Sequence, residues 1–192
     1  MPHESPSEPW LSFLNDVDAA LDERTELHCM GGFAIMQAYG FDRATVDIDV
    51  LSVVPYSSGA SLLKLAGKES LLRTEHAIYV DVVTVATAPE EYATRVVPLC
   101  PGHWERLNLY VLEAHDLALT KLERNFERDR ADVAYLASAG FLKPAILRER
   151  YFKELRPYIH GRKSWHDRTL ELWLEAYFPI DNRLGPGASN RE

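Results

Sequence analysis

Two aspartates inside an apolar, β-branched stretch constrain the fold of this chain more than any other feature. Residues 46–53 are Val-Asp-Ile-Asp-Val-Leu-Ser-Val, and the alternation of Asp47 and Asp49 with Ile48 and Val50 has the period of a half-buried strand. Both carboxylates therefore lie on one face, about 6.5–7 Å apart at Cα. Because like charges repel and aspartate is disfavoured in strands, the pair is costly unless a cation lies between the two side chains.

A glycine pair precedes the aspartates. Residues 26–30 predict a short strand, Gly31 and Gly32 a turn, and residues 33–39 a helix that ends at Gly40. Glycines let the backbone approach a phosphate closely, and the free N–H groups and dipole of a helix start favour an anion. On its own the pair indicates a plain turn. Followed by the aspartate pair, it indicates a phosphate site.

A third acidic residue lies in the clearest predicted strand, residues 76–85, which is β-branched on both sides of Asp81. An ion pair with an arginine, or an exposed strand face, would explain this aspartate structurally. If its strand lies beside that of Asp47 and Asp49, three carboxylates converge, and three can hold two divalent cations about 3.5–4 Å apart. Since Mg²⁺ prefers oxygen ligands, the functional interpretation is a site for two Mg²⁺ ions.

Charged residues also mark the segment after a last predicted strand at residues 107–111. A helix from residue 113 is expected to carry Lys121 and Arg124 on its polar side, and a second helix has Asp129 and Asp132 near its start. A solvated helix face is the ordinary explanation for such a run.

Taken together, these patterns resemble the minimal nucleotidyltransferases of the DNA polymerase β superfamily, especially the AbiEii-like and related bacterial groups. The first half of the likeness is the glycine pair followed by Arg43-x-Thr45-x-Asp47-x-Asp49. The resemblance covers about residues 27–136 and implies that Asp47, Asp49 and Asp81 are catalytic metal ligands. Gly32 stands where many members have serine, so one hydroxyl contact to phosphate is missing from this motif.

The resemblance also implies which residues bind the nucleotide. In the second half of the pattern the family lysine lies near the phosphates and the acidic helix start organises it. Nucleotide binding is therefore expected to involve seven residues: Gly31, Gly32, Arg43, Thr45, Lys121, Asp129 and Asp132.

The predicted fold is α/β, a nucleotidyltransferase-like mixed sheet flanked by helices with a C-terminal helical cluster. We expect a core at residues 1–140, a helical extension of the same domain at 141–180 and a flexible tail at 181–192. The predicted function is Mg²⁺-dependent nucleotidyl transfer from an NTP to a hydroxyl of an RNA, such as tRNA, or of a protein, by a toxin of a toxin–antitoxin pair. A catalytically silent nucleotide-binding or antitoxin-like protein, and a metal-dependent phosphohydrolase, are open alternatives.

Composition limits the partners. No apolar run approaches the roughly 20 residues of a membrane span, and no signal peptide is recognisable, so a cytoplasmic protein is expected. Net charge is −8, yet residues 141–168 carry eight basic against three acidic side chains. An RNA acceptor would be held there by Arg148, Arg156, Arg162 and Lys163. Alternatively, these residues pair with acidic groups of the same chain, of an antitoxin or of a second copy.

Overall fold

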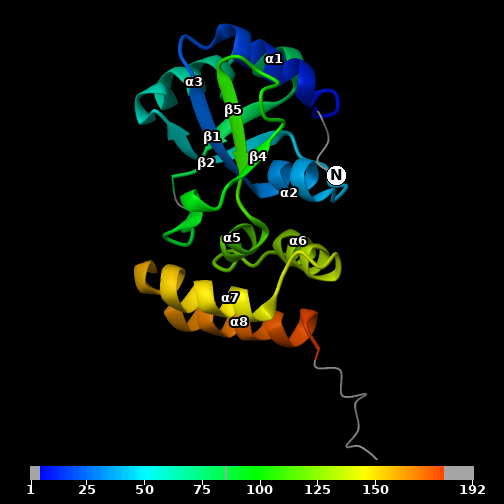
Figure 1. Cartoon of the computed structure of the whole chain (residues 1–192), viewed down its shortest axis with the longest axis vertical. Helices are drawn as coiled ribbons and strands as arrows, with labels where there is room; N and C mark the ends of the chain where they lie inside the picture. The colour runs from blue at the N-terminus through cyan, green and yellow to red at the C-terminus, as the bar shows by residue number, and fades with distance from the viewer. Residues whose placement is uncertain (1–4, 85, 180–192) are drawn as a thin grey trace, which may run out of the picture.

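The computed structural model describes residues 5–84 and 86–179. Within these ranges the strands are β1 (Thr25–Met30), β2 (Asp47–Val54), β3 (Tyr79–Val82), β4 (Val97–Leu99) and β5 (Leu107–Val111). They form one sheet in the order β3-β2-β1-β5-β4 (Figure 1). The β1–β2 and β4–β5 pairs are antiparallel, whereas β1–β5 and β2–β3 are parallel. The mixed sheet predicted from the sequence is confirmed.

Helices form two groups. The first is α1 (Trp10–Ala20), α2 (Gly31–Tyr39), α3 (Gly59–Ala66) and α4 (Leu71–His76), and the second is α5 (Ala114–Leu119), α6 (Glu127–Ser138), α7 (Pro144–Arg150) and α8 (Lys163–Tyr177). The first group packs around the sheet, and the second forms a separate layer below it in Figure 1. The C-terminal helical cluster is therefore also confirmed. Among the described residues, no helix is both long and apolar enough to cross a membrane.

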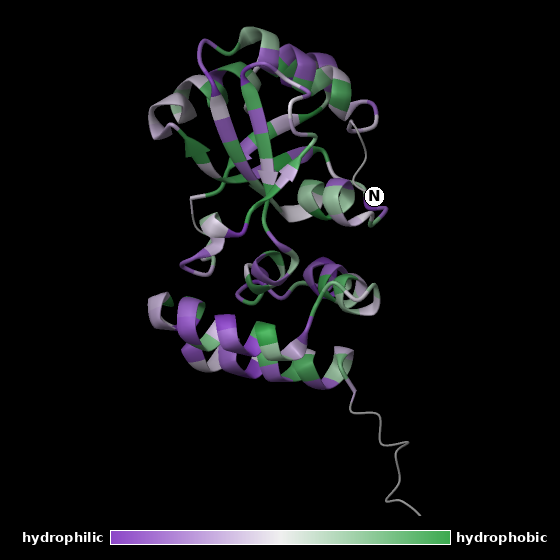
Figure 2. Cartoon of the chain, in the orientation of Figure 1, coloured by the Kyte–Doolittle hydropathy of each residue, from purple (hydrophilic) through white to green (hydrophobic). Residues whose placement is uncertain are grey.

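The alternation in β2 decides which way the aspartates face. Ile48 and Val50 are fully buried in the core, whereas Asp47 and Asp49 are only partly buried. Figure 2 shows hydrophilic and hydrophobic residues alternating along the strands of this sheet. The two carboxylates thus share the less covered face, as the period of two predicts.

One expectation about the sheet is wrong in detail. The strand predicted over residues 76–85 is only four residues long, β3, because the segment before it forms α4, whose N-terminus is capped by the Ser70 side chain. Strand β4, which was not predicted from the sequence, contains Pro98 and is preceded by a 3₁₀ turn at Tyr92–Thr94. A proline is tolerated there because β4 is an edge strand that pairs with β5 alone.

The helices after the sheet differ from the prediction at one functional point. Helix α5 ends at Leu119, so Lys121 and Arg124 lie in the turn before α6 and not on a helix face. The helix expected over residues 144–158 is one continuous run, in which α7 passes into a π turn and a 3₁₀ turn. The division of the chain into a core and an extension stays a prediction, and the tail at 181–192 lies outside the described residues.

An ion-pair cluster holds the helical layer to the loop before β4. Asp116 is fully buried and accepts hydrogen bonds from Arg95 at 2.9 and 3.1 Å and from Arg150 at 3.0 Å. Arg95 also donates to Glu154 at 2.6 Å, and Arg150 donates to Glu113. We call these five residues the support cluster. Each of its charges has an oppositely charged neighbour, so their burial is compensated.

Candidate active site

Strand pairing brings the three predicted metal ligands together. Asp49 is the register partner of Asp81 in the parallel β2–β3 pair and of Met30 in the antiparallel β1–β2 pair. Asp47 lies two residues before Asp49 on the same face, where its Oδ1 accepts a 2.5 Å hydrogen bond from the Thr45 hydroxyl. In the described part of the chain, none of the three carboxylates has an ion pair. The alternative of an arginine partner for Asp81 is thereby excluded within the described residues.

The glycine pair lies against these carboxylates, at the start of α2. Gly31 has φ +70°, and a Cβ there would lie 1.9 Å from Oδ2 of Asp49, so only glycine fits. At Gly32 a Cβ would lie 3.1 Å from Oγ1 of Thr45 and 3.3 Å from Cζ of Arg43. The Thr45 hydroxyl and the Arg43 guanidinium therefore crowd the space that a serine side chain would enter.

Basic side chains lie near the three predicted metal ligands, and two other, buried aspartates hold these basic side chains in place. Lys121 is 2% exposed, and its Nζ donates to Oδ2 of Asp132 at 2.8 Å. Arg43 donates to the same Oδ2, and Arg124 donates to Asp129 at 2.9 Å. Asp129 and Asp132 are themselves fully buried, so the alternative of a solvated face is wrong for these two residues and for Lys121, whereas Arg124 is exposed. We call these five residues the cavity cluster.

One atom of the cavity cluster is unsatisfied. Oδ1 of Asp132 is the single buried side-chain oxygen or nitrogen without a hydrogen-bond partner in the part of the chain that the structure describes. Oδ2 of Asp132 is paired with Lys121 and Arg43, but the bare Oδ1 is costly in a buried carboxylate, whereas both oxygens of Asp116 in the support cluster accept hydrogen bonds. The cavity cluster is therefore less completely satisfied than the support cluster.

Glycines, carboxylates and cations line one cavity of about 480 Å³. We call it the first cavity. Eight of the ten predicted site residues line it, namely Gly31, Gly32, Arg43, Thr45, Asp47, Asp49, Asp81 and Lys121. Asp129 and Asp132 lie behind Lys121 and hold it in place. Arg124 and Arg128 also line the cavity and were not predicted as site residues, although their spacing of three and seven residues from Lys121 was a usable signal.

The electrostatics of the first cavity favour a cation. Burial, together with the negative charges of Asp47 and Asp81, raises the pKa of Asp49 to about 6 against the opposing effect of Arg124 and Lys121. An acid so placed binds a proton or a metal ion more readily than an exposed one. The donors are all carboxylate oxygens, which is the ligand set of Mg²⁺. The three aspartates therefore fit such ions.

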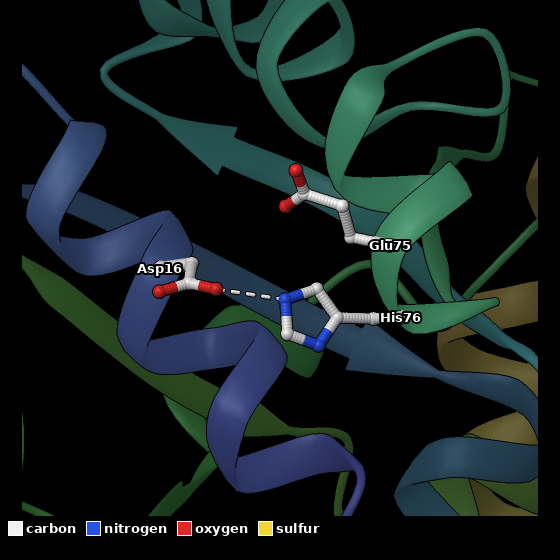
Figure 3. A group of neighbouring side chains, drawn as sticks. All are labelled: Asp16, Glu75 and His76. Carbon is white, nitrogen blue, oxygen red and sulfur yellow. Dashed lines mark hydrogen bonds and ion pairs between the residues drawn. The ribbon is translucent and has the colours of Figure 1, made fainter.

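Another group of metal-type ligands lies elsewhere. Asp16, Glu75 and His76 bring one ligand atom each within 4.8 Å of one another, and among the described residues they alone do so (Figure 3). The carboxylate oxygens of Asp47, Asp49 and Asp81 do not all come within that distance of one another. Nε2 of His76 already bonds Oδ2 of Asp16 at 2.7 Å, which joins α4 to α1. Neither helix lines the first cavity, so we assign this group to packing.

Comparison with known proteins extends over nearly the whole described fold. The family model described as "Nucleotidyltransferase of unknown function (DUF6036)" matches residues 12–180. That range contains every strand and all ten predicted site residues. No curated protein and no solved structure matches the chain.

Proposed function

Because the chain belongs to DUF6036, a family of nucleotidyltransferases of unknown function, we propose that it transfers a nucleotidyl group from an NTP to a hydroxyl acceptor in a Mg²⁺-dependent reaction. The observation that carries this proposal is that acidic and basic side chains line the same cavity. Asp47, Asp49 and Asp81, which have no ion pair among the described residues, line it together with Arg43, Lys121, Arg124 and Arg128. A metal–triphosphate complex needs both signs of charge in one cavity.

Each group has a proposed task. Asp47, Asp49 and Asp81 would hold the Mg²⁺ ions, with Asp81 contributing to the one that activates the acceptor hydroxyl. When bound, two Mg²⁺ ions lower the pKa of the acceptor hydroxyl and neutralise the developing charge. The acceptor oxygen forms a bond to the α-phosphorus, the bond from that phosphorus to the oxygen bridging to the β-phosphate breaks, and pyrophosphate leaves. The acceptor proton passes to Asp81, the most exposed of the three carboxylates.

The glycine turn and the basic side chains bind the phosphates. Backbone N–H groups at Gly31 and Gly32 cradle phosphate oxygens. The Thr45 hydroxyl lies beside Gly32 and donates a hydrogen bond to Oδ1 of Asp47, so it positions that carboxylate next to the bound phosphates. Lys121 and Arg43 stabilise the charge on the leaving pyrophosphate. Asp132 positions both cations, since they share its Oδ2.

For the acceptor we propose an RNA such as tRNA, and for the biological role an AbiEii-like toxin held by an antitoxin. The basic segment offers less for RNA than the sequence suggests. Arg148 pairs with Glu171 at 2.7 Å, and Arg156 pairs with Asp167 at 2.8 Å. In the described part of the chain, Arg162 and Lys163 make no ion pair, so they are the candidates for phosphate contacts.

Two differently labelled NTPs test the proposed reaction. Purified protein is incubated with Mg²⁺, total RNA or protein, and each NTP labelled on either the α- or the γ-phosphate. We expect α-label in the acceptor and γ-label in pyrophosphate, and neither in Asp49→Asn. Label in orthophosphate without labelled acceptor would show a phosphohydrolase. Retained NTP binding without turnover would show the silent nucleotide-binding protein.

A further inference from the structure

A second cavity adjoins the first. It has a volume of about 460 Å³, and Asp49 and Arg124 line both cavities. Its other walls are mostly apolar, from Met30, Val83, Ala86 and Phe126, and they also include Thr120, Glu123 and Arg162. The two cavities therefore adjoin at Asp49 and Arg124, and charged side chains predominate in the lining of the first whereas apolar side chains form much of the second.

We propose that the second cavity binds the nucleobase of the NTP whose triphosphate lies in the first cavity. This inference rests on the proposed function and adds the residues that hold the base. An NTP has the same polarity along its length, because a highly charged triphosphate is joined through ribose to a planar, uncharged ring. The carboxylate shared by the two cavities is then adjacent to the α-phosphate, where the bond must break.

Phe126 is the residue that points to a planar ligand. Its side chain is 57% exposed although it lines a cavity, and no other described aromatic ring packs against it. Exposed phenyl rings are unfavourable in water, and a nucleobase stacked on the ring would cover it. The backbone keeps the ring in place, because N–H of Phe126 donates to Oδ2 of Asp129 at 3.2 Å.

The same segment joins base binding to phosphate binding. Asp129 accepts from the Phe126 backbone and from Arg124, and it lies 3.7 Å from Nζ of Lys121. Glu123, next to Arg124, has its backbone carbonyl bonded to Nε1 of Trp165 at 3.2 Å, which fixes this wall to α8. The carboxylate of Glu123 makes no ion pair or hydrogen bond in the described ranges, so it can accept an N–H from the edge of a base.

Inorganic tripolyphosphate separates the base from the phosphates. With Mg²⁺ present, the affinities of the four NTPs and of tripolyphosphate are measured for wild type, Phe126→Ala and Phe126→Trp. We expect Phe126→Ala to weaken the binding of the NTPs by about 5- to 100-fold, which is what loss of a stacking aromatic costs, and to leave tripolyphosphate unchanged. Phe126→Trp should bind the NTPs as wild type does, because it keeps an aromatic ring for stacking. Tyr56→Ala removes an aromatic side chain that is 93% exposed and lines neither cavity, and it leaves both affinities unchanged.

The possible failures are distinct. If wild type binds neither NTP nor tripolyphosphate, the proposed function itself is wrong. If both ligands bind and Phe126→Ala changes neither affinity, the first cavity holds the phosphates and the base lies elsewhere, which overturns the present inference. Unchanged NTP affinity together with slower transfer in Phe126→Ala would assign the second cavity to the acceptor, and would overturn it as well.

Discussion

The support cluster and the first cavity both contain aspartates and arginines, but the acids are ion-paired in the support cluster and, among the described residues, not in the first cavity. In the support cluster, buried Asp116 has two arginine partners, and Glu154 and Glu113 take the remaining donors of those arginines. In the first cavity, Asp47, Asp49 and Asp81 have no ion pair among the described residues. Buried Asp132 lies behind that cavity, where its Oδ2 is paired with Lys121 and Arg43 and only its Oδ1 is bare. Compensated charges hold two layers together, whereas uncompensated charges are available to a ligand.

The pKa values of one acid from each region show the same difference. Burial by itself would raise the pKa of Glu113, but hydrogen bonds and charges from His115 and Arg150 lower it to about 2. Burial and the charges of the neighbouring aspartates together raise the pKa of Asp49 to about 6. Glu113 is thus stabilised as an anion by the fold, and Asp49 is destabilised as one.

The largest expected effect comes from removing a charge in the first cavity. Asp49→Asn should lower transfer by about 1,000-fold or more, because both ions lose a ligand. Asp47→Asn should do the same. Asp16→Asn, in the packing group of α1 and α4, is the matched control and should keep full activity. Loss of folding in both cavity variants would instead give the pair a structural role.

Removing a charge from the support cluster should lower the stability of the fold and leave ligand binding unchanged. Asp116→Asn leaves two arginine side chains facing a neutral amide, so the free energy of unfolding should fall by about 3 kcal/mol. The affinity for tripolyphosphate, measured on the folded variant below its melting temperature, should not change. A denaturant titration beside the binding assay measures both. Weaker binding with unchanged stability would place Asp116 in the active site.

Lys121→Ala should lower both properties, since Lys121 belongs to the cavity cluster and is buried. We expect kcat/KM for the NTP to fall by about 100-fold, as for loss of one charge-stabilising donor. Stability should fall as well, because Asp132 loses one of its two partners. Steady-state kinetics with a thermal melt measures this. Unaltered kinetics and nucleotide affinity would show that Lys121 has no contact with substrate.

Asp49 and Glu113 should contribute to the pH dependence of stability with opposite signs, and this effect is smaller than the preceding ones. In metal-free buffer the folded protein binds the Asp49 proton more tightly than the unfolded chain, so its contribution to stability falls as the pH rises from about 4 to 6. Glu113 contributes stability above its ordinary pKa of 4.5, and this is lost as the pH falls towards about 2. Asp49→Asn should therefore raise stability at pH 8, by about 1 kcal/mol, and Glu113→Gln should lower it. The same sign for both variants at pH 8 would contradict the comparison.

The smallest effect concerns RNA. Replacing Arg162 and Lys163 with alanine should reduce the log–log slope of RNA affinity against salt by up to about 2 units. Replacing Arg148 and Arg156, which are paired within the chain, should change the slope less. Equal slopes for the two double variants, or no RNA binding in low salt, would favour a protein or small-molecule acceptor.

Local periodicity was sufficient to predict side-chain orientation where one face of a strand or helix is buried. The alternation around Ile48 and Val50 placed Asp47 and Asp49 correctly, and Gly40, with φ 75°, ends α2 as predicted. The proximity of Asp81 followed only from the assumption that the strands are neighbours, which the parallel β2–β3 pair confirms.

Periodicity alone was misleading where charged residues pair with one another. It predicted Lys121 on the polar face of a helix, yet Lys121 is buried because Asp129 and Asp132, eight and eleven residues later, surround its ammonium group. Such a pairing overrides the amphipathic pattern, which assumes that charges face water. The family resemblance, in contrast, implied that the acidic start of the next helix organises this lysine, and the two ion pairs agree with it. The second cavity could not be predicted at all, since its walls come from segments as far apart as Met30, Val83 and Phe126.

Metal binding by the three aspartates is the central claim, and a calorimetric titration of Mg²⁺ in the presence of a non-hydrolysable NTP analogue tests it most directly. We predict two ions per chain for wild type, one for Asp81→Asn and none for Asp49→Asn, with Asp16→Asn binding as wild type. Absence of Mg²⁺ binding in wild type, or two ions retained in Asp81→Asn, would contradict the account.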